Sequence, residues 1–141
     1  MRSILGAAIE EEADITLVDM EAGLEHLSRS GGTLAHADVL LAIMEPSRKS
    51  VITAARTMTL AEELGIPITV GIGNKARDSA DVEFFEQLCA EFGLPLAGVI
   101  PYDRAIVDFD RSGGHVDPQS GDPLDAGVGR IIAFLDGVSV G

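Results

Sequence analysis

The stretch VLLAIMEPSRKSVITAARTMTLAEELGIPITVGIG, residues 39 to 73, decides the fold. Its two ends are continuous apolar runs rich in branched side chains, which is typical of strands covered on both faces. Between them, apolar residues recur at helical spacing, and Gly65 with a proline two residues later marks a helix end. A strand, a helix and a second strand in this order predict a parallel pair joined by a helical crossover.

The same alternation continues on both sides of this stretch. We therefore predict an α/β fold with an open, mostly parallel sheet and flanking helices. Residues 111–123 have the composition of a polar loop, no internal repeat is visible, and we expect residues 1–141 to form a single domain. The further strands are predicted at 15–19 (ITLVD) and 96–100 (LAGVI), and the further helices over 82–92, ending at Gly93, and 124–135, with Asp122 as N-cap and Pro123 as first residue.

Composition and charge exclude several classes of protein. At 141 residues the chain can bury roughly 68% of its unfolded surface, enough for one core. The formal charge of −13 opposes binding to a phosphate backbone or an anionic membrane surface, so we expect neither nucleic-acid nor membrane partners. The single cysteine, Cys89, cannot form an internal disulfide, and no signal segment or run of 18 apolar residues is visible. We expect a cytoplasmic protein.

Polar side chains gather where the predicted strands end. In open α/β sheets, ligands bind beyond the carboxyl ends of the strands, so these residues are candidates for a binding site. A simpler interpretation is that the following loops need helix caps and turn formers, which several of these residue types provide. The residues are Asp19 after the first strand, Glu45, Pro46 and Ser47 after the second, Asn74 and Lys75 after the third, and Pro101, Tyr102 and Asp103 after the fourth.

Asp19 and Gly23 together suggest nucleotide chemistry. In nucleotide hydrolases a strand-end acid faces the Mg²⁺ of a bound triphosphate, and a glycine beyond it lets a backbone amide approach the terminal phosphate. The G-x-x-x-x-G-K-[ST] phosphate loop, which precedes such a segment in those proteins, does not occur in the 141 residues.

Four motifs together resemble one family. They are DMEAGLEHLSR at 19–29, EPS at 45–47, NK at 74–75 and IPYD at 100–103. This pattern is similar to the CooC-type nickel-insertion accessory ATPases of carbon monoxide dehydrogenase. They belong to the deviant phosphate-loop ATPases, with the nitrogenase iron protein and the MinD and ParA division-site and partition ATPases. The resemblance covers nearly the whole chain but only the carboxyl-terminal part of such a protein.

The resemblance implies an ATP and Mg²⁺ site, and a role for each matching residue. Asp19 would hold the Mg²⁺ shell and Gly23 would lie near the γ-phosphate. Asn74 would offer its amide to adenine, with Lys75 beside it, and Pro101 with its neighbours Tyr102 and Asp103 would line the base pocket. For Asn74 and Lys75, a turn with a solvated lysine remains the alternative. Residues that would rearrange with the nucleotide and contact the partner enzyme, or else form a solvated face, are Glu21, Glu25, His26 and Arg29.

Individual residues indicate which base and which metal ligands to expect. Guanine recognition needs a carboxylate three residues after the asparagine, and Arg77 stands there, so adenine is favoured. His26 is a single imidazole beside a carboxylate, and Cys89 lies on an apolar face, so we expect no metal-ligand cluster in this chain.

The departures from the family leave two hypotheses open. Without a phosphate loop, most charge-assisted hydrogen bonds to the phosphates are missing, so ATP turnover by this chain alone is not expected and its status as an enzyme stays undecided. The phosphate-loop strand would lie between the strands that end at Asp19 and Met44, and its absence leaves unpaired edges or forces these strands to pair. Either the chain is the carboxyl-terminal portion of a dimeric, ATP-dependent maturation factor for carbon monoxide dehydrogenase or another metalloenzyme, or it is a non-catalytic protein-interaction module derived from a MinD/ParA-type ATPase.

Overall fold

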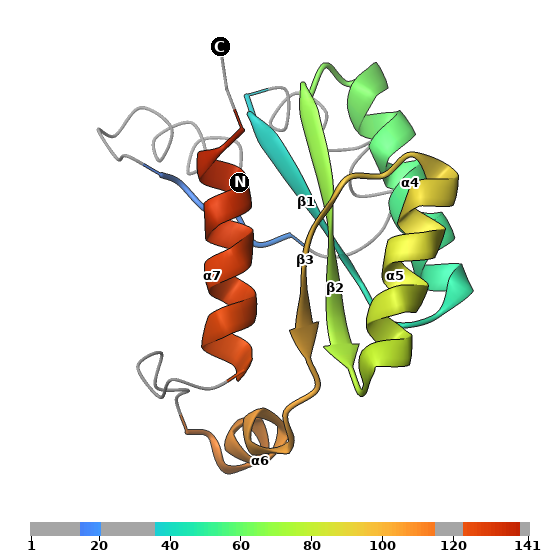
Figure 1. Cartoon of the computed structure of the whole chain (residues 1–141). Helices are drawn as coiled ribbons and strands as arrows, with labels where there is room; N and C mark the ends of the chain where they lie inside the picture. Colours follow the sequence, from blue (N-terminus) through green and yellow to red (C-terminus); the bar gives the residue numbers. More distant parts are fainter. Residues whose placement is uncertain (1–14, 21–35, 115–122, 139–141) are drawn as a thin grey trace.

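The fold is a three-stranded parallel sheet with helices on both faces (Figure 1). The computed structural model describes residues 15–20, 36–114 and 123–138. The strands lie in the order β1-β2-β3, and the predicted open, parallel α/β architecture is confirmed. The elements in chain order are β1 (Val39–Met44), α4 (Arg48–Glu63), β2 (Ile68–Ala76), α5 (Ser79–Phe92), β3 (Leu96–Pro101), α6 (Arg104–Ser112) and α7 (Pro123–Asp136).

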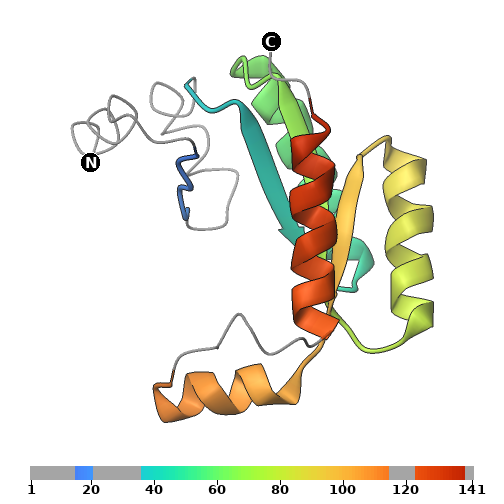
Figure 2. The ribbon, with the colours of Figure 1, turned by 60° about the vertical axis from the view of Figure 1, so that its left-hand side comes forward.

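The helices form two layers around the sheet. α4 packs on β1 and β2, α5 packs on β2 and β3, and α7 packs on β3 from the opposite side. Figure 1 shows α4 and α5 to the right of the strands and α7 to the left, and Figure 2 shows α7 in front of the sheet. Because all three strands run the same way, the segments after β1, β2 and β3 emerge at one edge of the sheet.

The central strand β2 separates two apolar cores. Val70 and Ile72 face α7 and pack with Ile131. Gly71 and Gly73 face the other way, toward the core under α4 and α5. A Cβ at Gly73 would lie 2.7 Å from Cδ2 of Phe85, a ring with no exposed surface, so only glycine fits there without displacing the ring.

Local sequence signals set the helix ends. The Ser47 hydroxyl accepts a hydrogen bond from the backbone N–H of Ser50 at 3.2 Å and caps α4. The helix stops predicted at Gly65 and Gly93 are confirmed, both with positive φ, and Gly93 is the left-handed cap of α5. α7 begins at Pro123 as predicted, whereas Asp122, the expected N-cap, lies outside the described residues.

Two expectations about elements are wrong. Residues 15–19 do not form a strand: the segment has irregular backbone, with Ile15 84% and Leu17 82% exposed. An apolar run becomes a strand only when a neighbouring strand satisfies its backbone, and none in the described part of the chain pairs with it. The predicted polar loop at 111–123 is also preceded by a helix that was not expected, α6, which extends to Ser112.

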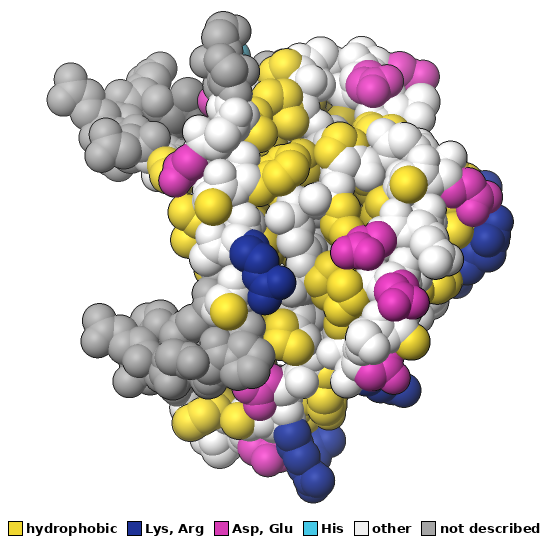
Figure 3. All heavy atoms as spheres, in the orientation of Figure 1, with side chains coloured by type: hydrophobic (Ala, Val, Ile, Leu, Met, Phe, Trp, Pro, Cys, Tyr) yellow, Lys and Arg dark blue, Asp and Glu magenta, His cyan; other side chains and the backbone are white. Residues whose placement is uncertain are grey.

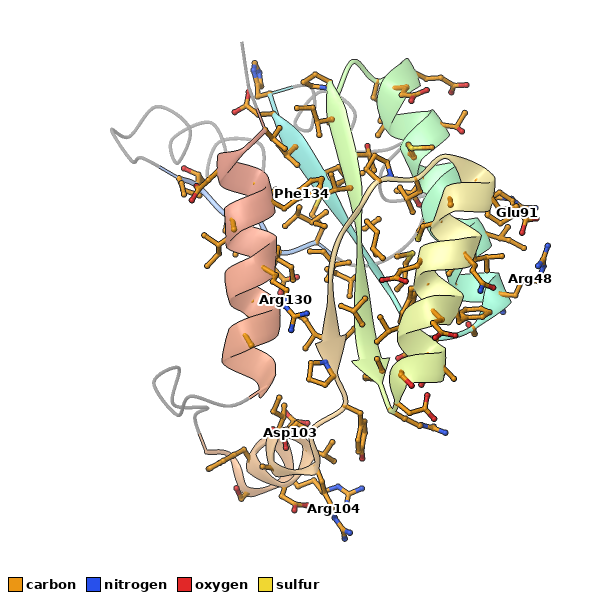
Figure 4. The ribbon with its side chains drawn as sticks, viewed as in Figure 1. Arg48, Glu91, Asp103, Arg104, Arg130 and Phe134 are labelled. Carbon is orange, nitrogen blue, oxygen red and sulfur yellow. The ribbon has the colours of Figure 1, made fainter. Side chains whose placement is uncertain are left out.

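The exposed face of α5 is acidic, whereas α4 exposes basic as well as acidic side chains, namely Arg48, Lys49, Arg56, Glu62 and Glu63. Figure 3 shows acidic side chains over these two helices, and the exposed residues include Glu62, Glu83 and Glu86. Arg48 of α4 forms an ion pair with Glu91 of α5 at 3.5 Å (Figure 4), with both side chains more than half exposed. None of the described helices combines the length and the apolar character needed to cross a bilayer.

Candidate functional site

The candidate site is the edge of the sheet at the carboxyl ends of the strands, which we call the carboxyl rim. It is formed by Glu45 and Ser47 after β1, Asn74 and Lys75 near the end of β2, and Pro101, Tyr102 and Asp103 at the end of β3 and just after it. The parallel pairing of the strands brings these three segments of sequence to the same edge. The structure therefore gathers every predicted base-side residue at one place.

An ion pair joins two strands across this rim. Lys75 Nζ lies 2.7 Å from Glu45 Oε1, with the side chains 55% and 62% exposed. The hydrogen bond and the charge of Lys75 lower the pKa of the Glu45 carboxyl below its usual value, and the same contact raises the pKa of the Lys75 ammonium. The sequence places Glu45 after a predicted strand but does not predict this pair, because the partners are 30 positions apart.

Lys75 has an unusual backbone conformation. Its φ of 58° places it in the left-handed region, which non-glycine residues rarely occupy. The Oδ1 atom of Asn74 accepts a hydrogen bond from the Lys75 backbone N–H at 3.0 Å and supports this turn. The bond also fixes the orientation of the Asn74 amide, so its Nδ2 group is the part that can donate to a ligand.

The end of β3 is attached to the end of β2. Pro101 pairs with Ala76, and the Tyr102 backbone N–H donates to the Ala76 carbonyl at 2.8 Å. The Tyr102 side chain is 47% exposed. An exposed aromatic ring and an amide donor at one edge are suited to a flat, hydrogen-bonding ligand such as a nucleotide base.

Two rim residues perform the capping roles that turn chemistry predicts. Asp103 Oδ1 accepts from the backbone N–H of Ala105 at 2.8 Å and caps α6, as Ser47 caps α4. The Asp103 carboxylate thus has a structural partner. Its predicted part in a base pocket stays a prediction.

Asp19 is not at the carboxyl rim. Its neighbour Met20 packs against Ala61 and Ile66, and Ile66 lies two residues before the start of β2, at the opposite end of the sheet. Asp19 itself is exposed and in irregular backbone. The other residues assigned to phosphate or partner contacts lie outside the described residues; they are Gly23, Glu21, Glu25, His26 and Arg29.

The described residues fit one half of an ATP site. Asn74, Pro101 and Tyr102 offer an amide donor, a partly buried ring and an aromatic face for a base. The phosphate and Mg²⁺ half does not fit in the part of the chain that the structure describes, because Asp19 lies apart from the rim and the Lys75 ammonium is paired with Glu45. Within the same residues, no three His, Cys, Asp or Glu side chains come together as a metal site.

Comparison with known proteins gives a direct sequence relationship. Over 113 residues, 80% of its length, the chain is 37% identical to the carbon monoxide dehydrogenase accessory protein CooC of Rhodospirillum rubrum. The chain resembles CooC. It is also 36% identical over 114 residues to an uncharacterized ATP-binding protein of Methanocaldococcus jannaschii, while no family model matches it. The resemblance predicted from the four motifs is confirmed.

The similarity to CooC covers only part of CooC. The matched region is 41% of the CooC chain and 43% of the M. jannaschii protein, so the chain spans about two fifths of the relatives it matches. Among solved structures, MinD of Aquifex aeolicus superposes with a TM-score of 0.63 at 21% identity, covering 76% of this chain and 47% of MinD. The MinC:MinD complex of the same organism gives 0.61 at 20% identity, covering 85% of this chain and 48% of that one. At such identities the likeness concerns the fold alone, and it agrees with an incomplete phosphate-loop ATPase fold.

Proposed function

We propose that this chain is the carboxyl-terminal portion of an ATP-binding, ATP-hydrolysing maturation factor of the CooC type. In this proposal the complete factor works as a homodimer and serves nickel insertion into carbon monoxide dehydrogenase or another metalloenzyme. The observation that carries it is the 37% identity to CooC over 80% of the chain. CooC is an accessory protein of carbon monoxide dehydrogenase, which suggests the client, and the parallel sheet shared with MinD supports the ATPase fold.

The carboxyl rim contributes the base side of the nucleotide site. Asn74 donates from Nδ2 to an acceptor on the adenine edge, while Pro101 and Tyr102 line the ring faces. Arg77 occupies the position where guanine recognition would need a carboxylate, and its backbone N–H is bound to Asp81 at 2.9 Å. Adenine is therefore the expected base.

The phosphate side depends on residues beyond the described sheet. Mg²⁺ in such a site would neutralise charge on the phosphates, with Asp19 holding its shell and Gly23 near the γ-phosphate. Glu21, Glu25, His26 and Arg29 would contact the partner. Because the rim alone offers no cradle for phosphates among the described residues, the 141-residue chain by itself is expected not to hydrolyse ATP.

A hybrid protein tests this proposal. The 141-residue chain is fused behind the segment of R. rubrum CooC that precedes the matched region, and Mg²⁺-dependent ATP hydrolysis is measured. The hybrid should hydrolyse ATP, Asp19→Asn should lower the rate at least about tenfold, and the exposed Gln87→Ala on α5 should leave it unchanged. A folded hybrid without ATP hydrolysis would contradict the proposal.

A second function is favoured by the state of the rim itself. Lys75 is paired with Glu45, and the neighbour of Asp19, Met20, packs away from the carboxyl rim, so the chain can also be a non-catalytic interaction module derived from a MinD/ParA-type ATPase. This alternative predicts a cooperative thermal transition for the isolated chain and no change in its midpoint with ATP or ADP. Aggregation of the isolated chain would argue against it.

A further inference from the structure

β2 carries a β-bulge where it reaches the carboxyl rim. Gly73 pairs with Val99 and Ala76 pairs with Pro101, so three residue steps on β2 match two steps on β3. The extra residue lies between these two pairs, where Lys75 has a φ of 58°. A bulge redirects the side chains around it, and a left-handed bulge residue is usually glycine. Lys75 therefore holds a conformation that its own side chain disfavours.

Two contacts hold Lys75 in this conformation. Its backbone N–H donates to Asn74 Oδ1 at 3.0 Å, and its ammonium pairs with Glu45 Oε1 at 2.7 Å. The first contact fixes the Asn74 amide, and the second ties the bulge to the segment that follows β1. Strained backbone persists where its surroundings over-determine it, and such residues cluster at ligand sites.

The backbone of Glu45 is itself anchored to the start of α4. Its N–H donates to Ser50 Oγ at 3.0 Å, and its carbonyl accepts from the Ser47 N–H at 2.7 Å. Ser47 is also the residue whose hydroxyl caps α4. Because these two bonds use only main-chain atoms of Glu45, its carboxylate extends to Lys75 from a fixed backbone.

We infer that Glu45 is a positioning residue of the base site: through its ion pair with Lys75, it holds the left-handed turn that orients the Asn74 amide toward an adenine base. The inference rests on the proposed function. Glu45 does not touch the base; it acts through Lys75, whose ammonium serves the turn rather than the phosphates. Because exposed ion pairs have small effects, Glu45 tunes the affinity for the nucleotide by a few fold.

A direct contact between the Lys75 ammonium and the nucleotide is the competing interpretation. In that case Glu45 would compete with the ligand for the ammonium, and removing its carboxylate would strengthen binding. The left-handed φ of Lys75 and its hydrogen bond to Asn74 favour the positioning role, because a ligand-binding lysine needs neither. The two interpretations therefore predict opposite signs for the loss of the Glu45 carboxylate.

Equilibrium binding of ADP to the CooC hybrid tests the inference. Glu45→Ala keeps the backbone bonds to Ser47 and Ser50 and should weaken ADP binding about two- to fivefold, the range that one exposed ion pair accounts for. Glu91→Ala is the matched control. It removes the ion pair between Arg48 and Glu91, whose side chains are similarly exposed on α4 and α5 (Figure 4), and it should leave ADP binding unchanged.

Substitutions of Lys75 separate the effect of its backbone from that of its charge. Lys75→Ala and Lys75→Gly both remove the ammonium, but only glycine adopts a positive φ without steric cost. Lys75→Gly should therefore bind ADP at least about threefold more tightly than Lys75→Ala, and adding Glu45→Ala to Lys75→Gly should change nothing. In the 141-residue chain, Glu45→Ala should also shift the Cα and Cβ NMR signals of Lys75 away from their left-handed values, whereas Glu91→Ala should not.

The outcomes separate this inference from the proposed function. Unchanged or tighter ADP binding by Glu45→Ala, or equal binding by Lys75→Gly and Lys75→Ala, overturns the positioning role even if the hybrid hydrolyses ATP. Weaker binding by Glu45→Ala, together with tighter binding by Lys75→Gly than by Lys75→Ala, supports the positioning role even if no ATP is hydrolysed, and the proposed function then fails alone. A folded hybrid that binds no ADP overturns both.

Discussion

Gly73→Ala should destabilise the protein although it adds a single methyl group. The new Cβ would lie 2.7 Å from Cδ2 and 2.9 Å from Cε2 of Phe85. Carbon atoms prefer separations of about 3.5 to 4.0 Å, so the overlap is close to 1 Å. Phe85 is fully buried in the core under α4 and α5 and has no free space into which to swing. We expect a loss of about 1 to 3 kcal/mol, the usual cost of overpacking a dense core.

Urea unfolding followed by circular dichroism measures this loss directly. The midpoint should fall with little change in slope, and the thermal midpoint should fall by about 3 to 10 °C for a chain of this size. Gly129→Ala in α7 is the matched control: its Cβ would meet nothing within 4 Å, so the change should stabilise the helix by about 0.5 to 1 kcal/mol.

A double-mutant cycle identifies the obstacle. In a Phe85→Leu background the smaller side chain leaves room for the methyl group, so adding Gly73→Ala should cost about 1 kcal/mol less than in the wild type. An equal cost in both backgrounds, or a cost below about 0.5 kcal/mol in the wild type, would refute the assignment of Phe85 as the steric limit.

Three further measurements test the rim, a helix cap and the core. The pKa of the Glu45 carboxyl is lowered in the folded state, so the ion pair stabilises the protein above the ordinary carboxyl pKa, and this stabilisation is lost as the pH falls through the lowered pKa. Lys75→Met should therefore raise the Glu45 pKa in an NMR titration, and an unchanged pKa would contradict the pair. Ser47→Ala should cost about 1 kcal/mol in urea unfolding and Ser47→Gly only a few tenths, and equal costs would count against the capping hydrogen bond. Burial raises the pKa of the Cys89 thiol, so Ellman's reagent should react with it only after unfolding, and immediate reaction of the native protein would contradict the packing.

The predicted strands are confirmed where another strand of the same chain lies beside them. The runs at 39–44, 68–73 and 96–100 lie in the sheet because each has a neighbour in the same chain, supplied by a helical crossover. The run at 15–19 has an equally apolar sequence, yet it is exposed and irregular. The composition of this run shows that it can form a strand, but not whether a neighbouring strand is present to pair with it. The strand prediction failed there for this reason.

Helix α6 shows a second limit of sequence analysis. It buries no residue fully, and with nine residues, RAIVDFDRS at 104–112, it is too short for an apolar repeat sustained over several turns to mark it. The useful signal was at its ends, where Asp103 caps the first turn and Gly113 ends the helix in a left-handed conformation. At the site, Asn74 and Lys75 could be predicted from their place after a strand, but the contact with Glu45 depends on the pairing of β1 with β2.

The position of Asp19 has the same cause as the failed strand prediction at 15–19: no described strand pairs with these residues. Met20 packs against Ala61 and Ile66 near the amino end of β2, and the seven residue steps from Ile68 to Lys75 separate that end from Lys75 by roughly 23 Å. For Asp19 to reach the carboxyl rim, residues 15–19 must straighten into a strand parallel to β1, which removes Met20 from its present contacts. Such a strand needs a neighbouring strand that satisfies its backbone N–H and C=O groups, and none of the described strands pairs with residues 15–19. Ordering of residues 15–19 as a strand and arrival of the Asp19 carboxylate at the rim would then be a single event, because Asp19 is the last residue of that predicted strand.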